Sequence, residues 1–326
     1  MQKKLIYFVF IIIISCYYLP EGIGEENKII VMVSEADKEI VEPQILDLFS
    51  HIIHTPQPET EFSITFKNPW DLDKVNKYSN LIIVSLDFPV DTTGDLLMSR
   101  IAVKNNQHND LFVLKDLFAT KQTVCAIHTV DAIALELVLN NNKKWILNEF
   151  RNTQYKRIKS NIYQYGKNSI ISRRIKEMFD YSIHLQPDYN IIKFDSLKPF
   201  IWIGRGMPYR WITLHKSSKD IFKNSISAWP ELERMYSETL PNIQISSNYR
   251  NTEIIFYNKE NRHLMRGIYE HEESESGGPF FVYIFDTETD NEVILVSGFI
   301  NYPGHNKILL LKQLEMIAFT LHKGDI

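Results

Sequence analysis

The sequence predicts an α+β protein with an α/β-like N-terminal half, connecting helices, and an antiparallel, β-rich C-terminal half that is closed by a helix. Three observations predict this class. Apolar runs alternate with helical spacing over residues 28–127. Residues 129–180 contain few glycines and repeat their apolar side chains at near-helical intervals. From residue 183 onward, short aromatic-rich runs are typical of antiparallel strands.

In the N-terminal half, an apolar, β-branched run at residues 28–33 predicts a buried strand. Ser34 then occupies the N-cap position of a helix whose apolar spacing continues to Ile52. Further strands are predicted at residues 61–66, 81–86 and 124–127. The last of these strands contains Cys125, which we expect to be a buried, unreactive thiol.

The centre of the chain predicts one or two long helices within residues 129–180, with a kink or break at the asparagines 140–142 and a second helix from Ser169 to Phe179. Beyond them the predicted strands are residues 200–203, 211–215, 254–257, 264–269, 280–285 and 293–300. A final amphipathic helix begins near Lys307. We therefore expect an N-terminal domain over residues 28–158 and a C-terminal domain over residues 159–326.

The first residues indicate export. Lys3 and Lys4 precede ten consecutive apolar residues, whereas a membrane-spanning helix needs about 20. The run ends at Ile13-Ile14-Ser15-Cys16, which resembles the lipobox of bacterial lipoproteins. We expect residues 1–15 to be a lipoprotein signal peptide, Cys16 to carry lipid such as palmitate, and residues 16–27 to be a flexible tether. A plain secretory signal and an uncleaved anchor are the alternatives.

Composition excludes several classes of protein. The 326-residue chain has a formal net charge of −4, so no global positive charge favours nucleic acid as a partner. Its two cysteines are too few for a disulfide framework or a four-thiolate zinc site. No phosphate-binding loop, nucleophile elbow or metalloprotease helix is present, although an active site need not be local in sequence.

Two groups of side chains could in principle hold a metal ion: His51 with His54, and His271 among the glutamates of residues 270–275. A solvent-facing helix end and a solvated acidic loop are the simpler interpretations. The sequence therefore predicts no metal site and no cofactor, and it identifies no catalytic residue.

Four motifs follow one another in the last third of the chain: R-G-I-Y at residues 266–269, G-G-P-F-F-V at 277–282, G-F-I-N-Y-P at 298–303 and K-Q-L-E at 312–315. This pattern resembles DUF4837, an uncharacterised family of Gram-negative envelope lipoproteins, and the resemblance extends more weakly over the whole body. Tyr269, Ser276, Ser297 and Lys312 depart from the family pattern, which indicates a divergent member. The resemblance implies an envelope location and an architecture but no mechanism.

One motif offers a possible binding loop, formed by Gly277, Gly278, Pro279 and Phe280 with Arg266 and Glu315 nearby. The two glycines and the proline predict a tight turn that enters a strand. Either the backbone must turn sharply against the final helix, or the glycine amides line a binding concavity.

Together these features predict a lipid-anchored cell-envelope protein facing the periplasm, attached to the membrane through Cys16. It would bind or assemble with an envelope protein or a glycan and would more readily be a binding protein than an enzyme. The alternative is an envelope hydrolase or glycan-active enzyme whose site is assembled from distant residues. A cavity that joins Arg266, Glu315, aromatic rings and paired carboxylates would favour the enzyme, and a flat apolar patch would favour a protein partner.

Overall fold

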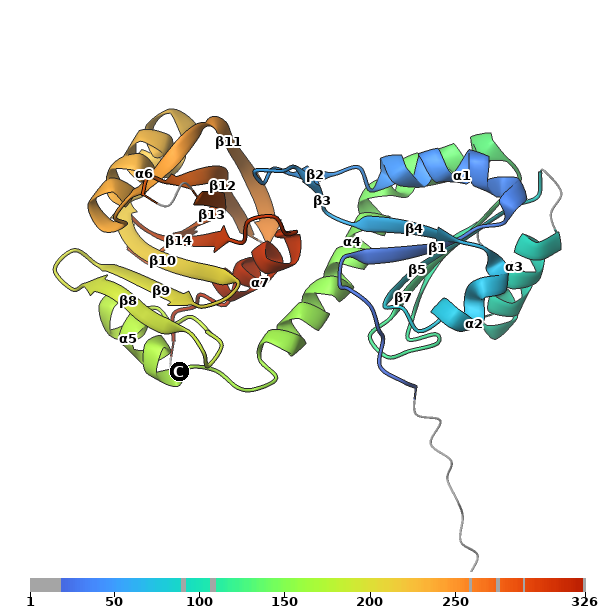
Figure 1. The fold of residues 1–326 in the computed structure, drawn as a ribbon, viewed down its shortest axis with the longest axis horizontal. Helices are drawn as coiled ribbons and strands as arrows, with labels where there is room; N and C mark the ends of the chain where they lie inside the picture. Colours follow the sequence, from blue (N-terminus) through green and yellow to red (C-terminus); the bar gives the residue numbers. More distant parts are fainter. Residues whose placement is uncertain are drawn as a thin grey trace, which may run out of the picture.

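The computed structural model describes residues 19–88, 92–105, 110–257, 260–273, 276–289 and 291–324, which form two bodies joined by a long helix (Figure 1). The predicted signal peptide over residues 1–15 and Cys16 lie outside the described residues. The elements of the N-terminal body and the joining helix are β1 (Lys28–Met32), α1 (Glu35–Leu48), β2 (Ile52–Ile53), β3 (Glu59–Thr60), β4 (Ser63–Lys67), α2 (Leu72–Val75), β5 (Asn80–Leu86), α3 (Thr92–Asn105), β6 (Leu111–Lys115), β7 (Thr123–Thr129) and α4 (Ala132–Ile162).

The N-terminal body is a five-stranded sheet in the order β4-β1-β5-β7-β6, with β6 antiparallel to four parallel strands. Successive residues of β1 enter opposite cores because side chains alternate across a strand. Ile29 and Val31 pack toward α1 and α4, whereas Ile30 and Met32 pack with residues of α3. Cys125 is fully buried in β7, which confirms the prediction of a buried thiol, and burial raises the pKa of that thiol to about 12.

Helix α4 runs without interruption from the N-terminal body toward the C-terminal body (Figure 1). It begins at an N-cap, Asp131, whose carboxylate accepts the Ala134 amide at 2.9 Å. The break predicted at residues 140–142 is wrong, because these asparagines stay helical and the Asn142 side chain donates to the Val138 carbonyl at 2.8 Å. The predicted domain boundary after residue 158 falls inside α4, which continues to Ile162.

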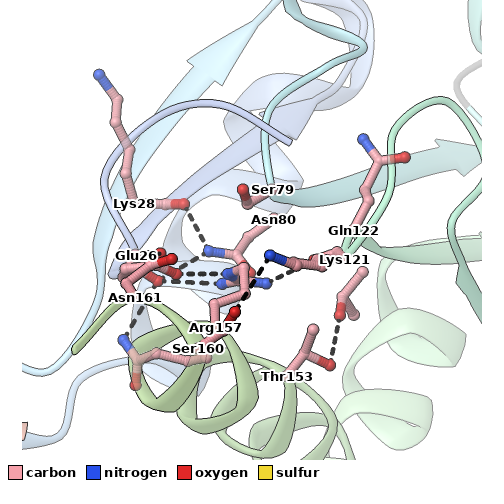
Figure 2. A network of polar contacts seen from close by, with 12 residues as sticks. Glu26, Lys28, Ser79, Asn80, Lys121, Gln122, Thr153, Arg157, Ser160 and Asn161 are labelled. Atoms are coloured by element: carbon pink, nitrogen blue, oxygen red, sulfur yellow. Dashed lines mark hydrogen bonds and ion pairs between the residues drawn. The ribbon is translucent and has the colours of Figure 1, made fainter. Parts of the chain in front are cut away.

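The segment before β1 is held against α4 rather than hanging free (Figure 2). Buried Arg157 forms an ion pair with Glu26 and donates to the Lys121 carbonyl at 3.0 Å and to Asn80 Oδ1 at 2.9 Å. The Gly22 amide donates to the Thr120 carbonyl at 3.1 Å. Residues 20–27 of the predicted flexible tether are therefore part of the folded body, since the backbone is hydrogen-bonded to it from Pro20 onward.

The C-terminal body is built on a seven-stranded antiparallel sheet in the order β11-β12-β13-β14-β10-β9-β8. Its elements are α5 (Ser169–Phe179), β8 (Asn190–Asp195), β9 (Phe200–Arg205), β10 (Tyr209–Ser218), α6 (Ser225–Thr239), β11 (Ile243–Tyr257), β12 (Glu260–His271), β13 (Ser276–Asp286), β14 (Glu292–Asn301) and α7 (Ile308–Ala318).

Each face of this sheet carries its own core. Phe280 packs on one face with Trp229 and Tyr236 of α6, whereas its neighbour Phe281 packs on the other face in the core that includes α5 and α7. The alternation of β13 side chains explains why an almost continuous apolar run forms a strand. The predicted fold class is confirmed for both halves of the chain.

The glycine-rich motif is not a turn. Gly277, Gly278 and Pro279 lie within β13 and pair with residues of β12, so the turn predicted here is wrong. The glycines are required by close backbone approach rather than by a positive φ. A Cβ at Gly278 would lie 1.9 Å from the Ile300 carbonyl oxygen, and a Cβ at Gly277 would lie 2.4 Å from that of Tyr269.

Among the described residues, seven strands and α-helices were not predicted: β2, β3, α2, α3, β6, β8 and α6. The first helix also ends at Leu48, so the prediction that it continues to Ile52 is wrong, because Ile52 lies in β2. Helix α6 contains Pro230, and strand β8 is exposed along its whole length, so neither has the pattern that identifies such elements. Within the described residues, no helix combines the length and the apolar character that crossing a bilayer requires.

Candidate functional site: a charged cavity between the two bodies

A cavity of about 300 Å³ lies where the two bodies meet. From the N-terminal side it is lined by His51, Ile53, Glu61 and one face of α4. That face carries Asn148, Arg151, Asn152 and Tyr155 at the spacing that aligns residues on a helix. From the C-terminal side it is lined by Glu253, Ile255, Leu264, Arg266, Tyr283, Lys312, Glu315 and Phe319. The site therefore exists only when both bodies are in place.

Six charged side chains of alternating sign run along this cavity. Glu61, which follows β3, accepts from Arg151 Nε at 3.0 Å and lies 3.2 Å from Lys312 Nζ. Lys312 also lies 3.7 Å from Glu315, whose other oxygen accepts from Arg266 Nη2 at 2.7 Å. Arg266 Nε in turn lies 3.5 Å from the half-exposed Glu253. The chain of charges crosses from one body to the other at Glu61 and Lys312.

Glu61 and Lys312 stay charged although they are buried. Burial alone would raise the pKa of Glu61, but Lys312 and the hydrogen bond from Arg151 outweigh it and lower that pKa to about 2. Burial would lower the pKa of Lys312, and the neighbouring Tyr155, Glu315 and Glu61 raise it instead. Burial lowers the pKa of His51, with Glu61 opposing it. The cavity is therefore lined by fixed charges and a neutral imidazole at pH 7.

A second contact fastens the bodies beside the cavity. At the start of helix α7 the Lys307 side chain makes no capping hydrogen bond; Asn306 Oδ1 accepts the Ile308 amide at 3.1 Å, and Glu59 of β3 supplies a second cap from the other body. Glu59 Oε2 accepts the Lys307 amide at 2.8 Å and the Ile308 amide at 3.2 Å, where the helix dipole favours a negative charge. His54 stacks on Tyr249 of β11 at 4.2 Å between ring centroids. The β2–β3 hairpin of the N-terminal body thus contacts the C-terminal body at α7 and at β11.

The structure unites two of the predicted site residues and separates the others. Arg266 and Glu315 form an ion pair in the wall of the cavity. Gly277 lines a different cavity with Pro56, Glu270 and Glu272. Gly278 and Pro279 serve strand packing, and Phe280 is buried in the core against Phe299 at 5.4 Å.

Sequence analysis missed Glu61, Arg151 and Tyr155 because they lie far from Lys312 in the sequence. One signal was available: Lys312 and Glu315 interrupt the apolar stripe of the final helix, and charged residues are rarely buried without partners. The two charged residues in this helix indicated that oppositely charged side chains must come from elsewhere in the chain. The sequence did not identify which side chains these are.

Three other side chains converge in the N-terminal body. Ligand atoms of Asp87, Asp95 and His128 lie within 4.8 Å of one another beside the ends of β5 and β7. His128 Nε2 already lies 3.2 Å from Asp87 Oδ1, so an ion pair accounts for part of this arrangement. His51 and His54, which could have shared a metal, instead lie in the cavity wall and against Tyr249. The predicted absence of a metal site stays a prediction.

Comparison with protein families divides the chain near the same point as the structure. Residues 168–320 match the family model described as domain of unknown function DUF4837. Residues 22–163 match a second model, described as domain of unknown function DUF8532. The two halves of the chain therefore resemble two different uncharacterised families. The resemblance to DUF4837 is thus confirmed for the C-terminal body, whereas the N-terminal body matches another family.

Comparison with solved structures gives weak likenesses. A protein from Bacteroides thetaiotaomicron matches at 11% identity and a TM-score of 0.28 over 44% of this chain, which spans 45% of that protein. The Ran-binding protein Mog1p of Saccharomyces cerevisiae matches at 6% identity and a TM-score of 0.32 over 44% of this chain and 90% of its own. These scores are too low to assign a shared fold. A search of curated proteins gave no match.

The lowered pKa of Glu61 predicts how stability depends on pH. Its charged form contributes stability that is fully present above about pH 4.5 and is lost as the pH falls toward 2. We expect Glu61→Gln to lower the free energy of unfolding by about 3 kcal/mol at pH 7 and by less than half as much at pH 3. Urea unfolding at both pH values measures this difference.

Glu39→Gln is the matched control, because Glu39 is exposed on α1. Its effect should be small at both pH values. A stability loss for Glu61→Gln that is equal at pH 7 and pH 3 would show that Glu61 is not held by its charge.

Proposed function

We propose that this protein is a lipid-anchored binding protein of the cell envelope that holds a small ligand in the cavity between its two bodies. The observation that carries the proposal is the cavity itself, which has polar walls from both bodies and buried charges. Ligand sites occur preferentially at domain interfaces, with a few placed polar groups on a mixed apolar wall. A flat apolar patch, which would favour a protein partner, is not what these residues form.

The charges favour binding over hydrolysis. A glycosidase needs one carboxyl group that stays protonated near neutral pH so that it can donate to the leaving group. Glu61 is instead locked in its ionised form between Arg151 and Lys312, and Glu315 is paired with Arg266 and Lys312. An envelope hydrolase is the second candidate, because the cavity does bring His51, Glu61 and Glu315 together from distant parts of the chain.

Anchoring is supported by the lipobox-like sequence at residues 13–16 and by the resemblance of the C-terminal body to DUF4837. The backbone is hydrogen-bonded to the N-terminal body from Pro20 onward. Three residues separate Pro20 from Cys16, and the four steps between their Cα atoms span at most about 14 Å when extended. A lipid on Cys16 would hold the N-terminal body close to the membrane surface.

Replacing the lipidated thiol tests the anchor. We expect Cys16→Ser to abolish incorporation of labelled palmitate and to release the protein from membranes, because several acyl chains are needed for stable attachment. Cys125→Ser is the matched control and should stay in the membrane fraction, since Cys125 is buried in β7. Retention of Cys16→Ser in membranes after high-salt washing would contradict lipid anchoring.

Blocking the cavity tests the binding site. Asn152 is exposed on the face of α4 that lines the cavity, so Asn152→Trp should fill the cavity without disturbing the core. Asn141→Trp is the matched control, because Asn141 is exposed on the same helix but does not line this cavity. Full-length protein is incubated with the small-molecule fraction of a cell-envelope extract, washed and analysed by native mass spectrometry.

We expect a molecule that the wild type and Asn141→Trp retain and release unchanged, and that Asn152→Trp does not retain. A ligand bound equally by Asn152→Trp would place binding elsewhere and contradict the proposal. Conversion of the molecule into a smaller product by the wild type would contradict a pure binding role and support the hydrolase.

A further inference from the structure

We infer that the cavity accepts an uncharged, hydroxyl-rich ligand, a mono- or disaccharide. This inference rests on the proposed function and specifies its ligand class. Three properties of the wall carry it: its charges cancel, it keeps unused hydrogen-bonding groups of both kinds, and it places aromatic and aliphatic side chains among them.

The charges of the wall cancel within the protein. Three cations face three anions along the cavity, and each is already paired: Arg151 and Lys312 with Glu61, Arg266 with Glu315 and Glu253. A charged ligand would either remain without a counter-ion in a partly buried site or displace a buried partner, and an uncompensated buried charge is costly. An uncharged ligand avoids both costs.

The wall nevertheless has hydrogen-bonding groups to spare. Glu315 is about 1% exposed and its Oε2 is buried beside Lys312 Nζ at 3.7 Å, so the accessible groups are the side-chain amides of the exposed Asn148 and Asn152. Neither side-chain amide has a hydrogen-bond partner within the described part of the chain. Each side-chain amide can both donate and accept. Hydroxyl groups, which do both, satisfy this set.

The remaining wall suits the carbon skeleton of a sugar. Tyr155, Tyr283 and Phe319 contribute rings, and Ile53, Ile255 and Leu264 contribute aliphatic surface. Such side chains cover the C–H faces of a ligand while its edges meet the polar groups. The volume of about 300 Å³ lies at the lower end of the range for small-molecule sites, so a long polymer would enter only by one end.

An amino acid is the strongest competing ligand, because its ammonium group could approach the half-exposed Glu253 and its carboxylate could approach Arg151. Arg151, however, already donates to both oxygens of Glu61. A ligand carboxylate would have to compete with this pair, which gives the neutral ligand the advantage.

Isothermal titration calorimetry on the full-length protein tests the ligand class, in a detergent without a sugar headgroup. The probes are glucose, N-acetylglucosamine and maltose, compared with glycine, arginine and inorganic phosphate. We expect saturable binding of at least one saccharide and at least tenfold weaker binding of every charged or zwitterionic probe. Binding of the saccharide should be lost in the Asn152→Trp variant and retained in the Asn141→Trp variant.

A second variant tests the hydrogen-bonding argument. Asn148→Leu keeps the size of the side chain and removes its amide, so saccharide affinity should fall about fivefold to tenfold, as for one hydrogen bond. Thermal unfolding checks that each variant is folded. Undiminished saccharide binding by both Asn148→Leu and Asn152→Trp would overturn the inference.

The outcomes separate this inference from the proposed function. If glycine or phosphate binds best and Asn152→Trp abolishes that binding, the saccharide class is wrong and the binding site stands. If no probe binds but an envelope molecule is retained through Asn152, the saccharide class is again wrong. If neither a probe nor an extract molecule depends on Asn152, both proposals fail.

Discussion

The ion pair between Glu61 and Lys312 is the interaction on which the rest of the arrangement depends. It joins the two bodies within the chain of six charges that lines the cavity. Removing Lys312 would leave Glu61 with Arg151 alone, and removing Glu61 would leave Lys312 with Glu315 at 3.7 Å, so either change weakens the pairing of a buried charge, which is unfavourable. The same pair therefore fixes how the bodies sit together and gives the cavity between them its balanced charge.

The sequence predicts elements whose burial is complete and regular. The runs at β1, β5 and β7 are buried on both faces, so their apolar, β-branched residues identify them directly. Ser34 caps α1 as predicted, accepting the Asp37 amide at 3.2 Å. Elements with an irregular pattern are not predicted from the sequence. Strand β8 is an exposed edge strand, and helix α6 contains Pro230. The glycines at 277 and 278 were misread because a close approach of backbone leaves the same sequence mark as a turn.

The candidate site could be predicted only in part. Motifs of the C-terminal third identified Arg266 and Glu315 as candidate site residues, and these two residues form an ion pair in the cavity wall. Glu61 and Arg151 were not, since their role depends on how two bodies pack, and no local pattern encodes that packing. Glu59 is a clear example: as a sequence it is one acid among many, yet it caps a helix that begins about 250 residues later.

A double-mutant cycle between Glu61 and Lys312 tests the central claim most directly. The free energies of unfolding of Glu61→Gln, Lys312→Met and the double variant are compared with that of the wild type. We expect a coupling energy of at least about 1 kcal/mol at pH 7, because each single change leaves a buried partner charge that the double change removes. A coupling energy near zero would show that the two residues do not interact across the bodies.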